Sequence, residues 1–243
     1  MGRIQKPIQL LNRVERKRDT TNVLVIGDLH EPFCLDGYLD LARSVHKAYK
    51  CTHTIFIGDF IDSHATTMHD PDPDGMSAGQ ELEEARERLQ RWVKYFPVAD
   101  CVIGNHDRRV HRKAFQAGIS SKWIRHFGDV LGAPGWEFRE EFIYDGVKYI
   151  HGEQGTARAR ARKDLISTVQ GHRHNEAYVD HIVGESCSIF WMQVGCGVDR
   201  RSYAMQYARA GSKPAIAVGV VLDHGRFPLN VMAELKGGKI LNV

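Results

Sequence analysis

The sequence predicts an α/β domain in which helix-linked parallel strands are followed by hairpins, giving two sheets with helices outside. Two observations lead to this prediction. Short apolar runs alternate with helical patterns in the first half of the chain, and the second half is richer in strands. With 243 residues, 42% of them hydrophobic, the chain can also bury a sizeable core, which excludes a disordered or fibrous protein.

Three strands joined by helices are predicted in the first half, at residues 22–26, 54–57 and 99–103. Each strand ends at a glycine followed by a polar residue. Apolar side chains at helical spacing predict one helix over residues 38–49 and a second over residues 80–96.

The second helix carries its own start signal, because Ser77 and Gln80 stand in the relation of a capping box. Two carboxylates on its outer face precede arginines by one turn, in the pairs Glu84/Arg88 and Glu87/Arg91. This spacing predicts ion pairs within the helix.

Hairpins dominate the second half, where Asp145-Gly146 is a strong two-residue turn signal. The strands predicted here cover residues 142–144, 147–150, 168–170, 177–183, 189–194, 216–222 and 229–234.

The positive charge is concentrated at the start of the chain. Residues 1–19 contain six Lys/Arg and two Asp/Glu, whereas the whole chain has a net charge of only +3. We therefore divide the chain into a basic N-terminal arm, residues 1–20, and one domain, residues 21–243. Such an arm can contact nucleic acid or an anionic surface, but most arms of this kind are only solvated.

The sequence predicts a cytoplasmic protein. The first residues lack the apolar run of a signal peptide, and the longest near-apolar stretch, residues 214–222, is about half of what a bilayer requires. The five cysteines are odd in number and show no CxxC spacing, which favours reduced thiols over a disulfide framework or a zinc site. The oligomeric state is not indicated.

Polar residues that suit metal binding follow the predicted strands. Since ligands of open α/β sheets bind at the carboxyl ends of strands, these residues are expected to converge. Carboxylate, imidazole and amide oxygen together suit two divalent transition metals. The residues are Asp28, His30, Asp59, Asn105, His106, His151, His172 and His174.

Taken together and in this order, the motifs resemble the calcineurin-like metallophosphoesterase family. They are GDLH at residues 27–30, GDFID at 58–62, GNHD at 104–107, the His-Gly pair at 151–152 and GHRH at 171–174. The resemblance covers about residues 22–175. It implies a four-layer α/β/β/α sandwich and a dinuclear, metal-dependent phosphoesterase.

The resemblance also implies a role for each matching residue. Asp59 would bridge the two metal ions. Asp28, His30 and His174 would hold one ion, and Asn105, His151 and His172 would hold the other. Manganese is the metal most expected, with iron, zinc, nickel or cobalt as alternatives.

His106 would act as general acid or transition-state stabiliser, oriented by Asp62. A hydroxide bridging the ions would attack phosphorus in line, and His106 would protonate the leaving oxygen. Asp107 is an alternative partner of His106, or else it caps the following turn.

The substrate class follows from departures from the family pattern. Protein phosphatases carry GDxxDRG and GNHE, whereas Ser63 replaces that arginine here and the third motif ends in Asp107. We therefore expect a phosphodiesterase or nuclease that acts on nucleotides or nucleic acid. The alternatives are a phosphomonoesterase and a non-catalytic scaffold that binds a partner.

Three other segments allow two interpretations each. Arg108 and Arg109 either bind substrate phosphate or start an exposed basic helix. The run of Arg158, Arg160, Arg162 and Lys163 is more consistent with a solvated helix than with a basic strand face. Residues 70–81 fit the calcium-loop spacing D-x-D-x-D-G-x5-E, with a rigid Asp-Pro loop as the alternative.

Overall fold

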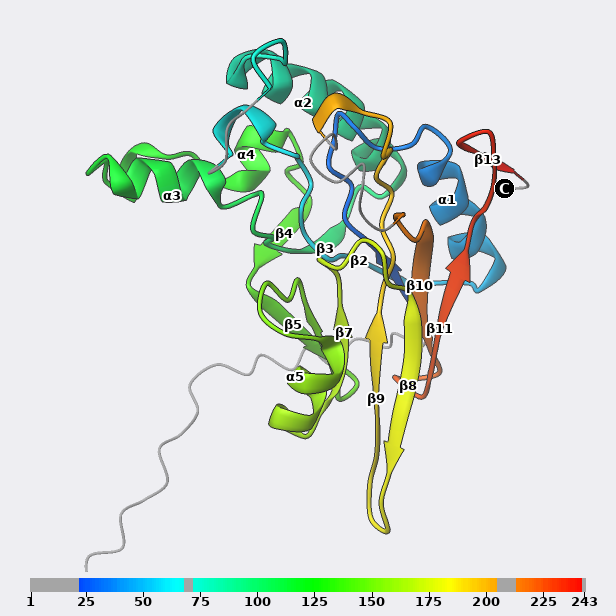
Figure 1. The fold of residues 1–243 in the computed structure, drawn as a ribbon. Helices are drawn as coiled ribbons and strands as arrows, with labels where there is room; N and C mark the ends of the chain where they lie inside the picture. Colours follow the sequence, from blue (N-terminus) through cyan, green and yellow to red (C-terminus); the bar gives the residue numbers. More distant parts are fainter. Residues whose placement is uncertain (1–21, 68–71, 205–212, 242–243) are drawn as a thin grey trace, which may run out of the picture.

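The fold is seen in a computed structural model, which describes residues 22–67, 72–204 and 213–241 (Figure 1). The basic arm predicted for residues 1–20 lies outside these residues. No helix in the described ranges has the length and the apolar character that crossing a membrane requires. All five cysteines lie in the described ranges and are free thiols, four of them buried.

A six-stranded sheet forms the first half of the core, in the order β11-β10-β1-β2-β3-β4. Strands β1 to β4 run parallel, and β10 pairs antiparallel with β1 and with β11. The strands are β1 (Val23–Ile26), β2 (His53–Phe56), β3 (Ala99–Val102), β4 (Trp136–Arg139), β10 (Ala217–Leu222) and β11 (Phe227–Met232).

A five-stranded sheet forms the second half, in the order β5-β6-β7-β9-β8. Strands β6, β7 and β9 are parallel, and β5 and β8 pair antiparallel at the two edges. The strands are β5 (Glu141–Tyr144), β6 (Val147–Ile150), β7 (Ser167–Gln170), β8 (Tyr178–Val183) and β9 (Ser188–Gln193); β12 (Glu234–Lys236) and β13 (Lys239–Leu241) form a separate hairpin.

The helices connect strands along the chain, and those that pack on the sheets lie on their outer faces. The longest, α2 (Ala78–Tyr95), begins with the predicted capping box of Ser77 and Gln80, so this prediction is confirmed. The others are α1 (Tyr38–Ala48), α3 (Arg109–Gln116), α4 (Phe127–Leu131), α5 (Ala157–Asp164) and the 3-10 turns η1 (His64–Thr66) and η2 (Ser121–Trp123).

Strand β1 shows how the layers are held together. Its alternate side chains Leu24 and Ile26 pack with α1 and α2, whereas Val23 and Val25 pack against the second sheet. On the far side of the second sheet, Trp191 packs against Ala157 and Ala161 of α5. The order is helix, sheet, sheet, helix, so the predicted four-layer α/β/β/α sandwich is confirmed.

The predicted strands are all present, with ends shifted by at most two residues, as is usual for boundaries read from sequence. Strand β4 was not predicted. It buries Trp136, but Glu137 and Arg139 interrupt the apolar run that would signal a strand. The short helix α4 was not predicted either, whereas α3 is the exposed basic helix that was one alternative for Arg108 and Arg109.

The predicted ion pairs within α2 are wrong, because its arginines turn toward a buried carboxylate. Arg88 Nε donates to Glu31 Oε2 at 2.6 Å, and Arg91 lies 3.6 Å from Glu31 Oε1. Trp92 Nε1 also donates to Glu31. Burial raises the pKa of Glu31, and the two arginines oppose that rise. Helix α2 is thereby fixed to the segment that follows β1.

We expect Glu31→Ala to lower the free energy of unfolding by about 3 kcal/mol, because it leaves the partly buried Arg88 and the buried Trp92 without their acceptor. Urea unfolding at neutral pH measures this change. The matched control is Asp36→Ala, which removes the other carboxylate on Arg88. Since Asp36 is 85% exposed, its loss should cost less than about 1 kcal/mol. Equal losses in the two variants would contradict the role of Glu31.

Candidate metal centre

The predicted ligands come together at one edge of the sandwich, where strands of both sheets end. Asp28 and His30 follow β1, Asp59 follows β2, and Asn105 follows β3 in the first sheet. The remaining ligands follow the parallel strands β6 and β7 of the second sheet, and they are His151, His172 and His174. The convergence expected from the strand ends is therefore present.

One cluster consists of Asp28, His30, Asp59 and His174. The Nε2 atoms of His30 and His174 face each other at 3.1 Å. Asp28 Oδ2 lies 3.0 Å from His174 Nε2, and Asp59 Oδ2 lies 3.5 Å from His30 Nε2. These four donor atoms could hold a cation between them.

A second cluster shares Asp59 and adds His151 and His172. His151 Nε2 lies 3.2 Å from Asp59 Oδ2 and 3.3 Å from His172 Nδ1. The amide oxygen of Asn105 lies 2.8 Å from His151 Nε2 and 3.0 Å from His172 Nδ1. Asp59 is common to this cluster and the first, so its carboxylate lies between the two groups of donor atoms.

The backbone of several ligands is strained in the way that functional sites often are. His30, Asp59 and His172 have φ angles of 50°, 52° and 70°, which costs roughly 1–3 kcal/mol for each residue. Gly104 must be glycine here, because a Cβ would lie 2.1 Å from Asp59 Oδ1. The loops are thus shaped to present these side chains.

Hydrogen bonds behind the ligands fix the direction of the imidazoles. His151 Nδ1 donates to the carbonyl of Ile57 at 2.9 Å, so its Nε2 faces the cluster without a proton when the ring is neutral. The Nδ1 of His30 contacts Asp62 Oδ1 at 2.6 Å. Such contacts are the usual support of metal-binding histidines.

Asp62 orients His106, but not with its carboxylate. The Nδ1 of His106 donates to the Asp62 carbonyl at 2.5 Å, whereas the Asp62 carboxylate lies 3.5 Å from that nitrogen and binds His30 instead. Because a guanidinium only donates, the contact of Arg109 with His106 Nε2 at 2.9 Å makes Nε2 the acceptor. His106 is thereby held as one neutral tautomer.

Asp107 is not a partner of His106. Its carboxylate accepts the backbone N–H groups of Asp59, Phe60 and Gly104 at 2.8–2.9 Å, and so joins the loops that follow β2 and β3. Burial and the neighbouring Asp59 raise the pKa of Asp107 to about 6. Neither alternative holds: Asp107 is not bonded to His106, and it caps the loops after β2 and β3 instead of the turn that follows it.

The two arginines after this motif differ. Arg108 forms ion pairs with Glu140 and Glu153, so its cation is already neutralised. Arg109 donates to the carbonyls of Asp62 and Ser63 beside His106. Of the two predicted phosphate contacts, only Arg109 therefore lies at the centre.

The described part of the predicted calcium loop does not support a calcium site. Asp70 lies outside the described residues. Glu81, the expected bidentate ligand, accepts the backbone N–H groups of His64 and Ala65 at 2.8 and 3.0 Å. Its carboxylate therefore caps η1, and within residues 72–81 the rigid-loop alternative is favoured.

The electrostatics of the centre suit a cation. Burial alone would raise the pKa of Asp59, but the imidazoles around it, His151 foremost, hold that pKa well below its usual range. In return, Asp59 and Asp28 outweigh the burial of His151 and raise its pKa to about 10. Protonated imidazole therefore offsets the negative charge of the buried carboxylates. Since carboxylate, imidazole and amide oxygen are good ligands of divalent transition metals, the donor set fits two such ions.

With this geometry in place, comparison with known proteins identifies the family. The family described as calcineurin-like phosphoesterase matches residues 21–199. The chain belongs to that family. Its members generally hydrolyse phosphoesters with the help of divalent metals. No curated protein matches the chain.

Solved structures with a similar fold cover most of this calcineurin-like phosphoesterase, at low identity. Vacuolar protein sorting 29 from Cryptosporidium parvum is 15% identical with a TM-score of 0.48, covering 90% of this chain and 94% of that one. A metallophosphoesterase from Sphaerobacter thermophilus is 14% identical with a TM-score of 0.44, covering 89% of each chain. A phosphoesterase from E. coli is 11% identical with a TM-score of 0.39, covering 82% and 87%.

Two residues of this calcineurin-like phosphoesterase were not given their roles by sequence reasoning. Glu31 follows His30, and its backbone links the loops after β1 and β2, since its N–H donates to Phe60 and its carbonyl accepts from Asp62. A carboxylate next to the DLH motif was the available signal. Arg109 was singled out for substrate, but its contact with His106 had no sequence signal.

We expect Asp59→Asn to abolish the binding of both metal ions, because both donor clusters use the Asp59 carboxylate. Calorimetric titration with Mn²⁺ and elemental analysis of the purified protein measure this loss. Asp180→Asn, an exposed change on β8, is the control and should bind as the wild type does. Full metal content in Asp59→Asn would contradict the bridging assignment.

Proposed function

We propose that this chain is a dinuclear, metal-dependent hydrolase of phosphodiesters in nucleotides or nucleic acid. The observation that carries the proposal is the pair of donor clusters that share Asp59, with His106 beside them. Nε2 of His106 lies 4.0 Å from the shared Asp59 Oδ2, so the histidine and the expected ions would act on the same phosphoester.

Seven residues would hold the ions. Two divalent cations, with manganese the metal we propose, would activate water and neutralise the charge that develops on the phosphoryl oxygens. Asp28, His30 and His174 would bind one ion, Asn105, His151 and His172 the other, and Asp59 both. The tautomers set by the Ile57 carbonyl and by the Asp62 carboxylate keep ligand nitrogens directed at the site.

His106 is the residue that we propose for proton transfer to the leaving oxygen. Its Nδ1 is fixed by the Asp62 carbonyl, so Nε2 is the nitrogen that can reach substrate. Burial lowers the pKa of His106 to about 4 in the protein alone. A bound phosphoester anion would favour the imidazolium, because an opposite charge nearby raises the pKa.

Arg109 supports the same step. Its guanidinium lies on Nε2 of His106 and would be drawn to the oxygens of an incoming phosphoester, since guanidinium binds phosphate by paired hydrogen bonds. That movement would leave Nε2 free to take up a proton. Arg109 thus couples substrate binding to the readiness of His106.

The preference for diesters rests on sequence. Ser63 stands where protein phosphatases have an arginine, and its carbonyl instead accepts from Arg109. A phosphomonoesterase is the alternative enzyme. A non-catalytic scaffold is the least favoured reading, because every predicted ligand is present and near its neighbours. Five free thiols support a reducing, cytoplasmic location.

We expect metal-dependent cleavage of bis-p-nitrophenyl phosphate that is faster than cleavage of p-nitrophenyl phosphate. Both rates should fall to the blank in EDTA and return when Mn²⁺ is added in excess, because the proposed chemistry depends on the ions. Release of p-nitrophenol measures them. Faster monoester cleavage would favour the phosphatase alternative, and rates unchanged by EDTA would contradict a metal-dependent enzyme.

His106→Asn should retain both metal ions and lose turnover by about 10²- to 10⁴-fold, the usual contribution of a positioned proton donor. Steady-state kinetics with bis-p-nitrophenyl phosphate and metal analysis of the same sample test this. If the metal content falls together with the rate, His106 is a structural support of the ligands and not the proton donor. His126→Asn, outside the centre, serves as the control.

A further inference from the structure

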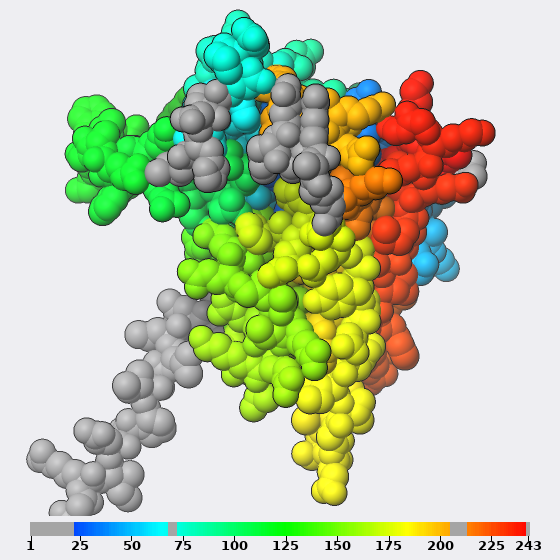
Figure 2. Space-filling view, viewed as in Figure 1, coloured from blue at the N-terminus to red at the C-terminus, as the bar shows by residue number. Residues whose placement is uncertain are grey.

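A basic and aromatic segment stands out from the body of the protein beside the metal centre. It consists of residues 108–125, which contain α3 and η2, and is called the α3 arm here. Figures 1 and 2 show α3, in green, projecting from the sandwich. No buried residue lies on α3, so the helix is not held there by a core of its own.

The charge of the α3 arm is of one sign. Residues 108–125 contain six Lys/Arg and no Asp/Glu. Arg108 is neutralised by its glutamates and Arg109 is turned to His106. Four cations form no ion pair with any residue in the described ranges, and they are Arg112, Lys113, Lys122 and Arg125.

Large apolar side chains are exposed among these cations. Phe115 is 83% exposed and Trp123 is 84% exposed, whereas the three other tryptophans are buried. Val110 and Ile119 are about half exposed. A ligand that carries both negative charge and flat apolar faces would match this combination of exposed rings and unpaired cations.

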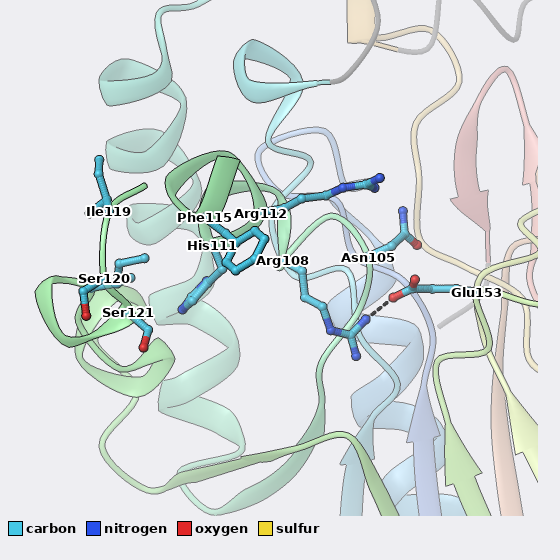
Figure 3. A pocket seen from close by; sticks show the side chains of 10 residues that line it. Asn105, Arg108, His111, Arg112, Phe115, Ile119, Ser120, Ser121 and Glu153 are labelled. Carbon is cyan, nitrogen blue, oxygen red and sulfur yellow. Dashed lines mark hydrogen bonds and ion pairs between the residues drawn. The ribbon is translucent and has the colours of Figure 1, made fainter. Parts of the chain in front are cut away.

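A pocket of about 500 Å³ joins the α3 arm to the metal centre. Its lining begins at Asn105, one of the proposed metal ligands, passes Arg108 and Arg112, and reaches Phe115. Figure 3 shows Arg112 extending toward the Asn105 side, with His111 and Phe115 farther along. The one carboxylate in the lining is Glu153, which is paired with Arg108.

We propose that the α3 arm binds single-stranded nucleic acid and leads it to the metal centre. This inference rests on the proposed function, since it names the substrate class of the same site. Unpaired cations would follow the phosphates, and Phe115 would stack on a base, which is the combination that single-strand binding requires. A duplex would bind less well, because the stacked bases inside it hide their faces from the ring.

The test is the affinity for a fluorescein-labelled single-stranded DNA of about 15 nucleotides, within the usual range of site sizes. Fluorescence anisotropy is measured in EDTA at several salt concentrations. The chelator prevents hydrolysis, so binding is measured independently of catalysis. Wild-type protein should bind the single strand more tightly than a duplex of the same sequence, and more weakly as salt rises.

Phe115→Ala should weaken binding about tenfold, the effect expected from losing one stacked base. Phe227→Ala, which removes an exposed phenylalanine on β11, is the matched control and should leave the affinity unchanged. Both side chains are exposed, and thermal unfolding should show equal stability for the two variants. Equal affinity of Phe115→Ala and wild type would overturn the proposal.

Arg112→Gln should weaken binding and lower the slope of log K against log salt by about 0.7, the value for one phosphate contact on a single strand. Arg162→Gln on α5 is the control, since Arg162 is also exposed and lies on the other basic helix. A wild-type slope in Arg112→Gln, or an equal fall of the slope in the control, would overturn the proposal. So would a dimer, seen in sedimentation, that Phe115→Ala dissolves, because a second copy would then cover the aromatic ring.

The inference and the proposed function can fail separately. Cleavage of bis-p-nitrophenyl phosphate without DNA binding in EDTA would leave the hydrolase proposal in place and overturn the role of the α3 arm. DNA binding that depends on Phe115 and Arg112, without metal-dependent cleavage of any phosphoester, would overturn the hydrolase proposal and support the α3 arm as a nucleic-acid site.

Discussion

The position of the Asp59 carboxylate is the constraint on which the rest of the centre depends. The backbone carbonyl of Asp59 accepts the N–H groups of Leu29 and His30, so the loop after β2 is bonded to the loop after β1. Its Oδ1 accepts the N–H of His106, which ties it to the loop after β3. One residue with a left-handed backbone therefore holds three strand ends in register, and its remaining oxygen faces both donor clusters.

The surroundings of Asp59 explain how several charged and polar side chains can be buried together there. The Asp107 carboxylate accepts the N–H of Asp59. The backbone of Glu31, in the loop after β1, bonds to Phe60 and Asp62 in the loop after β2. Each buried carboxylate has partners, as burial of charge requires. The centre is thus a continuous network in which supports and ligands alternate, and a strained backbone at His30, Asp59 and His172 is held by the hydrogen bonds around it.

Most of the fold and the proposed ligand set could be predicted from sequence because both depend on local order. Each proposed ligand follows a short apolar run, and parallel strands place their carboxyl ends at one edge whatever the remaining packing. The capping box of Ser77 is equally local. The strand β4 was missed because it mixes Trp136 and Phe138 with charged residues.

The partners of polar side chains could not be predicted, since they lie far apart in sequence. Arg88 had a carboxylate one helical turn away, yet it binds Glu31, which is 57 positions distant. Asp62 was expected to hold His106 with its carboxylate and uses its carbonyl, and Glu81 suited a calcium loop but caps η1. Desolvation decides these choices, because a buried carboxylate must find a donor and an exposed one need not.

The sequence by itself determined which residue types follow the strands, and therefore the layered fold, the family and the proposed metal ligands. The tertiary structure alone decided what each polar group does once buried. It turned Arg109 onto His106, gave Asp107 to the backbone, and left Phe115 exposed among unpaired cations. The physical reason is that periodicity and turn chemistry act over a few residues, whereas burial depends on segments that meet only after the sheets have packed.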